Sequence, residues 1–203
     1  MVRWCEADRP ALVVGSAQRD EVVDRIGAAA AGLSVVRRRS GGAAVVVGPG
    51  RLLWADVVLP AGDRLWANDV GVAPRWLGWC WARALEVVGV GPPAVHEAGL
   101  DRREWGSLVC FAGIGPGEVV IGDRKVVGIS QRRTREGALF QCAALLRWDP
   151  AEAVAGLALP ALERSAAIVE LADVAIGIDA LAGHPVGPAE VERAFLAELA
   201  RLG

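Results

Sequence analysis

The chain has 203 residues, 53% of them hydrophobic and 23% charged, and carries a formal net charge of -2 at pH 7. These values predict one globular domain with a substantial core and exclude a disordered chain. A chain so close to neutrality offers no general attraction for nucleic acid or for an acidic membrane, so neither is expected as a partner.

Targeting and metal-binding signals are weak. The N-terminus lacks the apolar centre of a signal peptide, and no apolar run reaches the roughly 18 residues that cross a bilayer, so we expect a cytoplasmic protein. The cysteines and histidines show no spacing typical of metal ligands, and no metal site is predicted from them. They are Cys5, Cys80, Cys110, Cys142, His96 and His184.

Short apolar runs that end at glycine or proline turns predict strands, and apolar residues at helical spacing predict helices. The predicted strands are residues 12–14, 33–36, 43–47, 52–59, 107–111, 119–121, 125–130 and 137–146, and the predicted helices are 21–31, 74–88, 151–155, 162–172 and 188–202. This order indicates an α+β fold with a mixed, largely antiparallel sheet and packed helices. We expect residues 1–150 to hold the sheet and residues 151–203 to form a helical segment packed on the same domain.

Lys125 is the only lysine of the chain. Arginine keeps its charge and its planar shape, whereas lysine is a compact point charge, so a single retained lysine suggests a site that arginine would not suit. The preceding Gly122-Asp123 predicts a tight hairpin, with Lys125 at the start of its second strand. Simple alternation would place Lys125 on one face of that strand and Gly128 and Ser130 on the other. Gly128 would leave a gap for a ligand or another backbone.

A second cluster, Arg37-Arg38-Arg39-Ser40-Gly41-Gly42, feeds a glycine turn. Three adjacent arginines repel one another unless an anion or an acidic partner is close. Glycine N–H groups beside a guanidinium can cradle phosphate or carboxylate oxygens, so the turn is a candidate anion site. A solvated surface turn is the alternative explanation.

The segments RRRSGGAAV, GDRKVVGISQRR and GALFQCAALL, in this order, resemble the biotin/lipoate protein ligase superfamily, and within it the lipoate-protein ligases and octanoyltransferases. The resemblance implies a catalytic domain in residues 1–150 that is related to biotin ligases and class II tRNA synthetases. It also implies transfer of a lipoyl or octanoyl group to a lysine of a lipoyl-domain protein. The donor would be lipoate or octanoate, activated as an acyl-adenylate with ATP and Mg²⁺.

The resemblance also assigns candidate site residues. Lys125 would be catalytic, contacting the activated carbonyl and the phosphate, where a fixed ammonium stabilises developing negative charge. The substrate and nucleotide would be bound by Arg38, Ser40, Gly41, Gly42, Gly128 and Ser130.

Cys110 supports a competing mechanism. The pair Cys110-Phe111 shortly before the lysine strand resembles the cysteine-dependent octanoyltransferases, in which the thiol carries the acyl group. Such an enzyme would take the acyl group from an acyl carrier protein and would need no cofactor. The alternative is a small buried side chain, which is a common environment for free cysteine.

The chain also departs from the pattern of the family. Ala43 stands where a third glycine is common, Val47-Gly48 replaces a His-Asp pair, and Gln141-Cys142 replaces a His-Gly pair. These changes remove polar groups that would handle the nucleotide and the metal ion. They motivate a third hypothesis, a relative that binds an acyl ligand without turnover.

Overall fold

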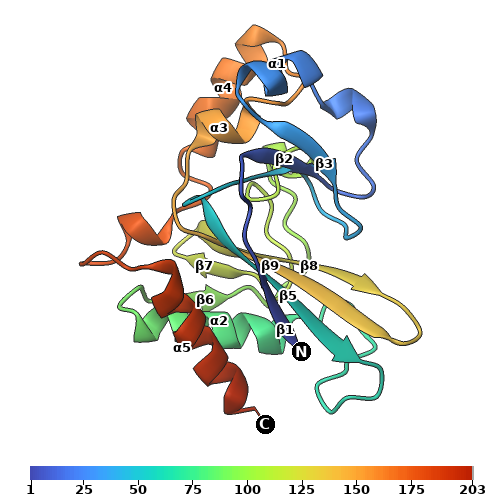
Figure 1. Ribbon diagram of the computed structural model, residues 1–203, viewed down its shortest axis with the longest axis vertical. Helices are drawn as coiled ribbons and strands as arrows, with labels where there is room; N and C mark the ends of the chain where they lie inside the picture. The colour runs from blue at the N-terminus through green and yellow to red at the C-terminus, as the bar shows by residue number, and fades with distance from the viewer. Residues whose placement is uncertain (203) are drawn as a thin grey trace.

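A computed structural model describes residues 1–202, and two β-sheets form the framework (Figure 1). The larger sheet has six strands, and every neighbouring pair in it is antiparallel. In spatial order the strands are β1 (Val2–Cys5), β5 (Leu52–Pro60), β9 (Gly137–Leu145), β8 (Arg124–Arg133), β7 (Val119–Ile121) and β6 (Ala94–Val95).

The smaller sheet has three strands and lies above the larger one in Figure 1. Its central strand, β2 (Ala11–Val14), pairs in parallel with β3 (Ser34–Arg37) and antiparallel with β4 (Val45–Val47). The mixed, largely antiparallel α+β architecture expected from the sequence is therefore confirmed.

Helices cover the outer faces of both sheets (Figure 1). The long helices α2 (Arg75–Val87) and α5 (Pro188–Ala200) pack beside each other under the larger sheet, and α1 (Arg25–Ala30), α3 (Pro150–Val154) and α4 (Ala161–Leu171) gather beside the smaller one. Three short 3-10 helices complete the elements: η1 (Asp20–Val22), η2 (Glu104–Ser107) and η3 (Ile178–Ala180). Within residues 1–202, no helix is both long and apolar enough to cross a membrane.

The buried side chains form three clusters that follow this layering. One fills the space between the larger sheet and helices α2 and α5, with Trp81 and Phe195 fully buried. A second lies between the smaller sheet and its helices, around Leu12 and Leu157. A third, which includes Phe111, joins the facing sides of the two sheets. The third cluster sets how the sheets face each other, and the candidate site lies beside it.

The strand predicted at residues 107–111 is wrong. The segment begins in η2 and continues as a compact loop, in which only Val109 forms an isolated bridge, to Ala44. The N–H of Val109 bonds back to Trp105, and a Cβ on Gly106 would come within 3.2 Å of the Gly113 Cα. The segment is apolar because two of the three clusters bury it, Val109 in the second and Phe111 in the third, and that burial gives the same pattern as a strand.

The predicted faces of the lysine strand are also wrong. The β7–β8 hairpin turns at Gly122-Asp123 as expected, but a β-bulge shifts the register, so that Val120 pairs with Lys125 and Val119 with Val127. The extra residue, Val126, points into the main core together with Val127. A bulge reverses the alternation beyond it. Lys125 therefore shares a face with Gly128, where a Cβ would lie 3.2 Å from its Cε.

Candidate functional site

A cavity of about 350 Å³ opens between the glycine turn at Gly41-Gly42, the 106–115 loop and strand β8. This volume is within the range of small-molecule sites. Its lining combines main chain, small side chains and a few polar groups: Gly41, Gly42, Ala43, Leu100, Gly106, Ser107, Cys110, Gly113, Gly115, Glu118, Lys125, Ile129, Ser130 and Gln131.

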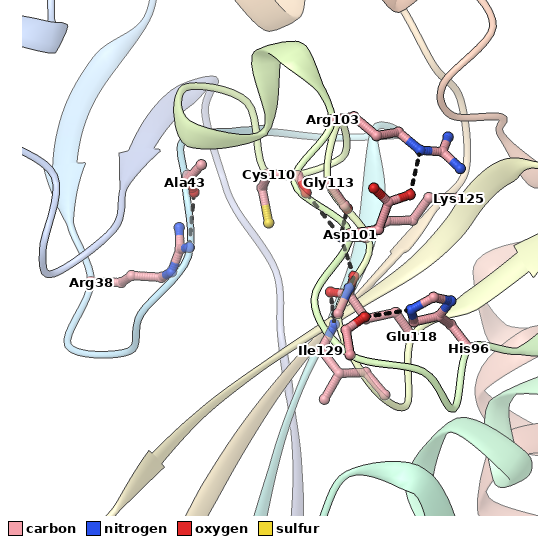
Figure 2. Close-up of polar contacts among 12 residues, drawn as sticks. Arg38, Ala43, His96, Asp101, Arg103, Cys110, Gly113, Glu118, Lys125 and Ile129 are labelled. Atoms are coloured by element: carbon pink, nitrogen blue, oxygen red, sulfur yellow. Dashed lines mark hydrogen bonds and ion pairs between the residues drawn. The ribbon is translucent and has the colours of Figure 1, made fainter. Parts of the chain in front are cut away.

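Lys125 is buried in the wall of this cavity, with 1% of its surface exposed. Its Nζ lies 2.7 Å from the Glu118 carboxylate and donates to the main-chain carbonyls of Cys110, at 2.8 Å, and Gly113, at 3.0 Å (Figure 2). The ammonium also lies 5.2 Å from the centre of the Phe111 ring. All three ammonium protons thus have partners, and Lys125 fixes the loop that carries Cys110.

Glu118 is a charged residue of the cavity wall that the sequence analysis missed. Besides its ion pair with Lys125, its carboxylate accepts hydrogen bonds from the N–H groups of Gly115, at 2.6 Å, and Ile129, at 2.9 Å. A buried ion pair needs such additional partners to offset the cost of removing both charges from water. A carboxylate between glycines and the apolar Val119–Ile121, close to the only lysine, was the signal that could have identified it.

Two of the three arginines before the glycine turn, Arg37 and Arg38, have protein partners. Arg37 pairs with Asp20, and Arg38 is buried and donates to the carbonyls of Val13, Gly41 and Ala43. Burial lowers the pKa of Arg38 from its ordinary value, although the neighbouring Cys110 opposes this shift. Arg38 therefore supports the turn from within the protein and is not among the residues that line the cavity.

Gly41 and Gly42 themselves line the cavity, and their main-chain N–H groups donate no hydrogen bond within residues 1–202. Gly42 has a positive φ of 92°, which brings its carbonyl against Gly15. A residue with a side chain rarely adopts this conformation. The turn thus places two N–H groups without a protein acceptor at the wall of the cavity.

Cys110 also lines the cavity, and its sulfur lies between Arg38 and Lys125 in Figure 2. A hydrogen bond from its N–H to the carbonyl of Ala44 anchors it, at 2.8 Å. Two other thiols are buried in the core away from this cavity: burial raises the pKa of Cys80 to about 11 and that of Cys142 to about 12. Cys110 is thus the thiol placed to meet a ligand in this cavity.

The structure brings most of the predicted site residues together. Five of the eight line the cavity: Lys125, Cys110, Gly41, Gly42 and Ser130. The other three surround it: Gly128 lies against Lys125, and Arg38 and Ser40 hold the glycine turn. Their roles in binding or catalysis are proposals, and they are argued below.

The sequence and the fold can be compared with those of known proteins. The family described as Lipoyl protein ligase A/B catalytic domain matches residues 1–200. The chain belongs to this family. The superfamily suggested by the arginine-glycine and lysine motifs is thereby confirmed.

Solved structures of the family share the fold. A bipartite lipoate protein ligase from Thermoplasma acidophilum, studied with its E2 lipoyl domain, superposes with a TM-score of 0.78 at 20% identity, over 98% of this chain and 69% of that one. A lipoate-protein ligase A bound with ATP gives 0.70 at 21% identity, over 98% of this chain and 71% of that one. The Plasmodium falciparum LipL1 in complex with lipoate gives 0.67 at 12% identity, over 98% and 48%. No curated protein matches the chain by sequence.

Proposed function

We propose that this protein transfers a lipoyl or octanoyl group to a lysine of a lipoyl-domain protein, and that Cys110 carries the group as a thioester. One observation carries the proposal: one cavity is lined by the Cys110 thiol and by two glycines, Gly41 and Gly42, whose N–H groups donate no hydrogen bond within residues 1–202. These are the groups that acyl transfer needs, a nucleophile and donors for the oxyanion that forms when the carbonyl is attacked.

The reaction has two balanced halves. The Cys110 sulfur attacks the carbonyl carbon of an acyl thioester, the bond to the carrier sulfur breaks, and the thiol proton passes to the departing carrier. The acceptor lysine amine then attacks the acyl group on Cys110, an amide forms, the carbon–sulfur bond to Cys110 breaks, and an amine proton returns to the Cys110 sulfur. In both halves the carbonyl oxygen becomes negative, and the N–H groups of Gly41 and Gly42 would donate to it, while Lys125 holds the loop that carries Cys110.

The cavity suits a thioester better than ATP with Mg²⁺. Its charged side chains are Lys125 and Glu118, which neutralise each other, and Arg38 is committed to main-chain carbonyls. A triphosphate needs several cationic or N–H partners, and Mg²⁺ needs carboxylate oxygens. The one carboxylate in the lining, Glu118, is paired with Lys125 and accepts two main-chain N–H groups, so it is not free for Mg²⁺. These residues do not fit the metal-nucleotide complex, so no step is assigned to it.

A second candidate is the ligase reaction through an acyl-adenylate. It is favoured by one observation, the match in fold to a lipoate-protein ligase A bound with ATP. In this candidate Cys110 has no covalent role, and Lys125 faces the activated carbonyl.

The two candidates differ in their donors and in their dependence on Cys110. The protein and an apo lipoyl domain are incubated either with octanoyl acyl carrier protein without ATP, or with octanoate, ATP and Mg²⁺. Intact-mass spectrometry then follows both proteins. We expect transfer from the carrier without ATP, an octanoyl adduct on Cys110, and a loss of more than about 100-fold in Cys110→Ser. Cys5→Ser, which changes a thiol outside the cavity, is the matched control and should retain activity.

Other results would overturn the proposal. Acylation that requires ATP and is unchanged in Cys110→Ser would establish the ligase. No acylation with either donor, while an octanoyl or lipoyl ligand still binds, would identify a non-catalytic relative.

A further inference from the structure

Behind the cavity, a chain of hydrogen bonds runs from Ser130 to a buried carboxylate. The Ser130 hydroxyl donates to Ser40 Oγ at 3.0 Å, and the Ser40 hydroxyl donates to Gln141 Oε1 at 2.6 Å. Gln141 Nε2 then donates to Asp56 Oδ1 at 2.9 Å. Ser130 lines the cavity, whereas Ser40 and Asp56 are buried.

Asp56 determines which group donates and which accepts in each of these hydrogen bonds. Its other donors are Arg3 Nη2, at 2.6 Å, and Trp54 Nε1, at 3.0 Å. Burial alone would raise the pKa of Asp56, but the hydrogen bonds from Gln141, Arg3 and Trp54 outweigh it and hold this pKa below its usual value. An ionised carboxylate can only accept hydrogen bonds. Gln141 must therefore turn its amino group towards Asp56 and its carbonyl towards Ser40.

The orientation of Gln141 in turn determines the donor and acceptor roles of Ser40 and Ser130, up to the cavity. Ser40 gives its only hydroxyl proton to the Gln141 carbonyl, so its lone pairs must accept from Ser130 and from Arg38 Nε, which lies at 3.1 Å. Ser40 has no exposed surface, so water cannot exchange with these partners. Ser130 in turn commits its proton to Ser40. What remains on the cavity side of Ser130 is the lone pairs of its oxygen.

We propose that Ser130 Oγ accepts a hydrogen bond from the acceptor lysine amine during acyl transfer, and that Gln141 and Asp56 are positioning residues that keep it an acceptor. The inference rests on the proposed function. An attacking amine must aim its lone pair at the carbonyl carbon, and an acceptor for one of its N–H groups orients it. The carbon–nitrogen bond forms, the carbon–sulfur bond to Cys110 breaks, and an amine proton goes to that sulfur. Because its proton is committed, Ser130 cannot serve as a donor to the oxyanion.

The test uses one acyl-enzyme and two nucleophiles. Protein carrying octanoyl on Cys110 is mixed either with an apo lipoyl domain, which attacks through an amine, or with holo acyl carrier protein, which attacks through the thiol of its prosthetic arm. Single-turnover rates are followed by intact-mass spectrometry. In Ser130→Ala we expect transfer to the amine to fall about tenfold, as for the loss of one hydrogen bond, and return to the thiol to stay within about twofold.

Two further variants distinguish a change in the donor and acceptor roles of these hydrogen bonds from a general change in packing around Asp56. Gln141→Met breaks the link to Asp56 and frees the Ser40 proton to turn towards Ser130, so it should also slow the amine reaction selectively. Trp54→Phe removes a different donor to Asp56 and leaves the direction of the chain unchanged, so both rates should stay close to those of the unchanged protein.

Equal slowing of both nucleophiles in Ser130→Ala, or no slowing of either, would overturn the assignment of Ser130. Equal effects of Gln141→Met and Trp54→Phe would overturn the positioning role of Gln141. Failure of the unchanged protein to form acyl-Cys110 is a separate result, which would overturn the proposed function and this inference with it.

Discussion

At the scale of single residues, two neighbouring glycines in the cavity wall differ in what a methyl group would meet. A Cβ on Gly41 would have no atom within 4 Å, whereas one on Gly42 would lie 2.7 Å from Arg38 Nη2 and 3.9 Å from Cys110 Sγ. Gly42 also has a positive φ. The conformation of the turn therefore depends on the second glycine.

This difference predicts opposite outcomes for two matched variants. Gly42→Ala should lower the free energy of unfolding by about 1–3 kcal/mol, because it strains the backbone and displaces Arg38, and it should reduce acyl transfer. Gly41→Ala should change stability by less than about 1 kcal/mol. Urea denaturation together with the acylation assay measures both effects. Similar losses in the two variants would contradict the special role of Gly42.

At the scale of elements, α5 is held against α2 and the larger sheet by aromatic contacts. Phe195 stacks on Trp81 with ring centres 4.1 Å apart, and Trp4 of β1 meets both rings edge-on, at 5.8 and 6.1 Å. Phe195 and Trp81 have no exposed surface. We propose from this contact that the C-terminal helix forms one cooperative unit with the sheet domain.

Adjacent residues of α5 test that proposal. Phe195→Ala should lower the free energy of unfolding by about 3–5 kcal/mol, as expected for a fully buried aromatic side chain. Leu196→Ala is the control, because Leu196 is 42% exposed, and it should cost less than about 1 kcal/mol. Thermal denaturation should remain a single transition in both. Separate unfolding of α5, with little effect of Phe195→Ala on the rest, would show that the helix is independent.

At the scale of the whole molecule, Asp56 connects parts of the chain that are far apart in sequence. Its carboxylate accepts hydrogen bonds from Arg3 of β1 and from Gln141 of β9. Gln141 in turn accepts a hydrogen bond from Ser40, which precedes the glycine turn. Since the pKa of Asp56 is lowered in the folded protein, its ionised form stabilises the fold.

Because the folded protein lowers the pKa of Asp56, the stability that Asp56 contributes depends on pH. The stabilisation is complete above the unfolded pKa of aspartate, about 3.9, and is lost as the pH falls through the lower folded value. The difference in unfolding free energy between the unchanged protein and Asp56→Asn should therefore be largest at pH 7 and shrink below pH about 4. Urea denaturation at several pH values measures it, with the exposed Asp8→Asn as control. A difference that is constant with pH would exclude the charge of Asp56 as its source.

Much of the fold could be predicted from the chain because its local signals agree. The hairpin at Gly122-Asp123, the helix from Arg75 to Val87 and the final strand Gly137–Leu145 each combine an apolar pattern with a clear turn or end signal. The prediction failed at residues 107–111 and at the faces around Lys125. In the first case, a buried loop has the same run of apolar residues as a strand. In the second, the sequence contains no signal for the β-bulge at Val126.

The sequence by itself determined the family, the order of most elements and the residues of interest, because Lys125, Cys110 and the glycine turn are chemically distinctive wherever they lie. The tertiary structure decided which of them meet and in what state. Arg38 donates to main-chain carbonyls, Lys125 pairs with Glu118, and Ser130 is linked through Ser40 and Gln141 to Asp56, 74 positions earlier. The physical reason is that charge compensation and hydrogen-bond direction depend on partners brought together by the packing of two sheets, which no local pattern encodes.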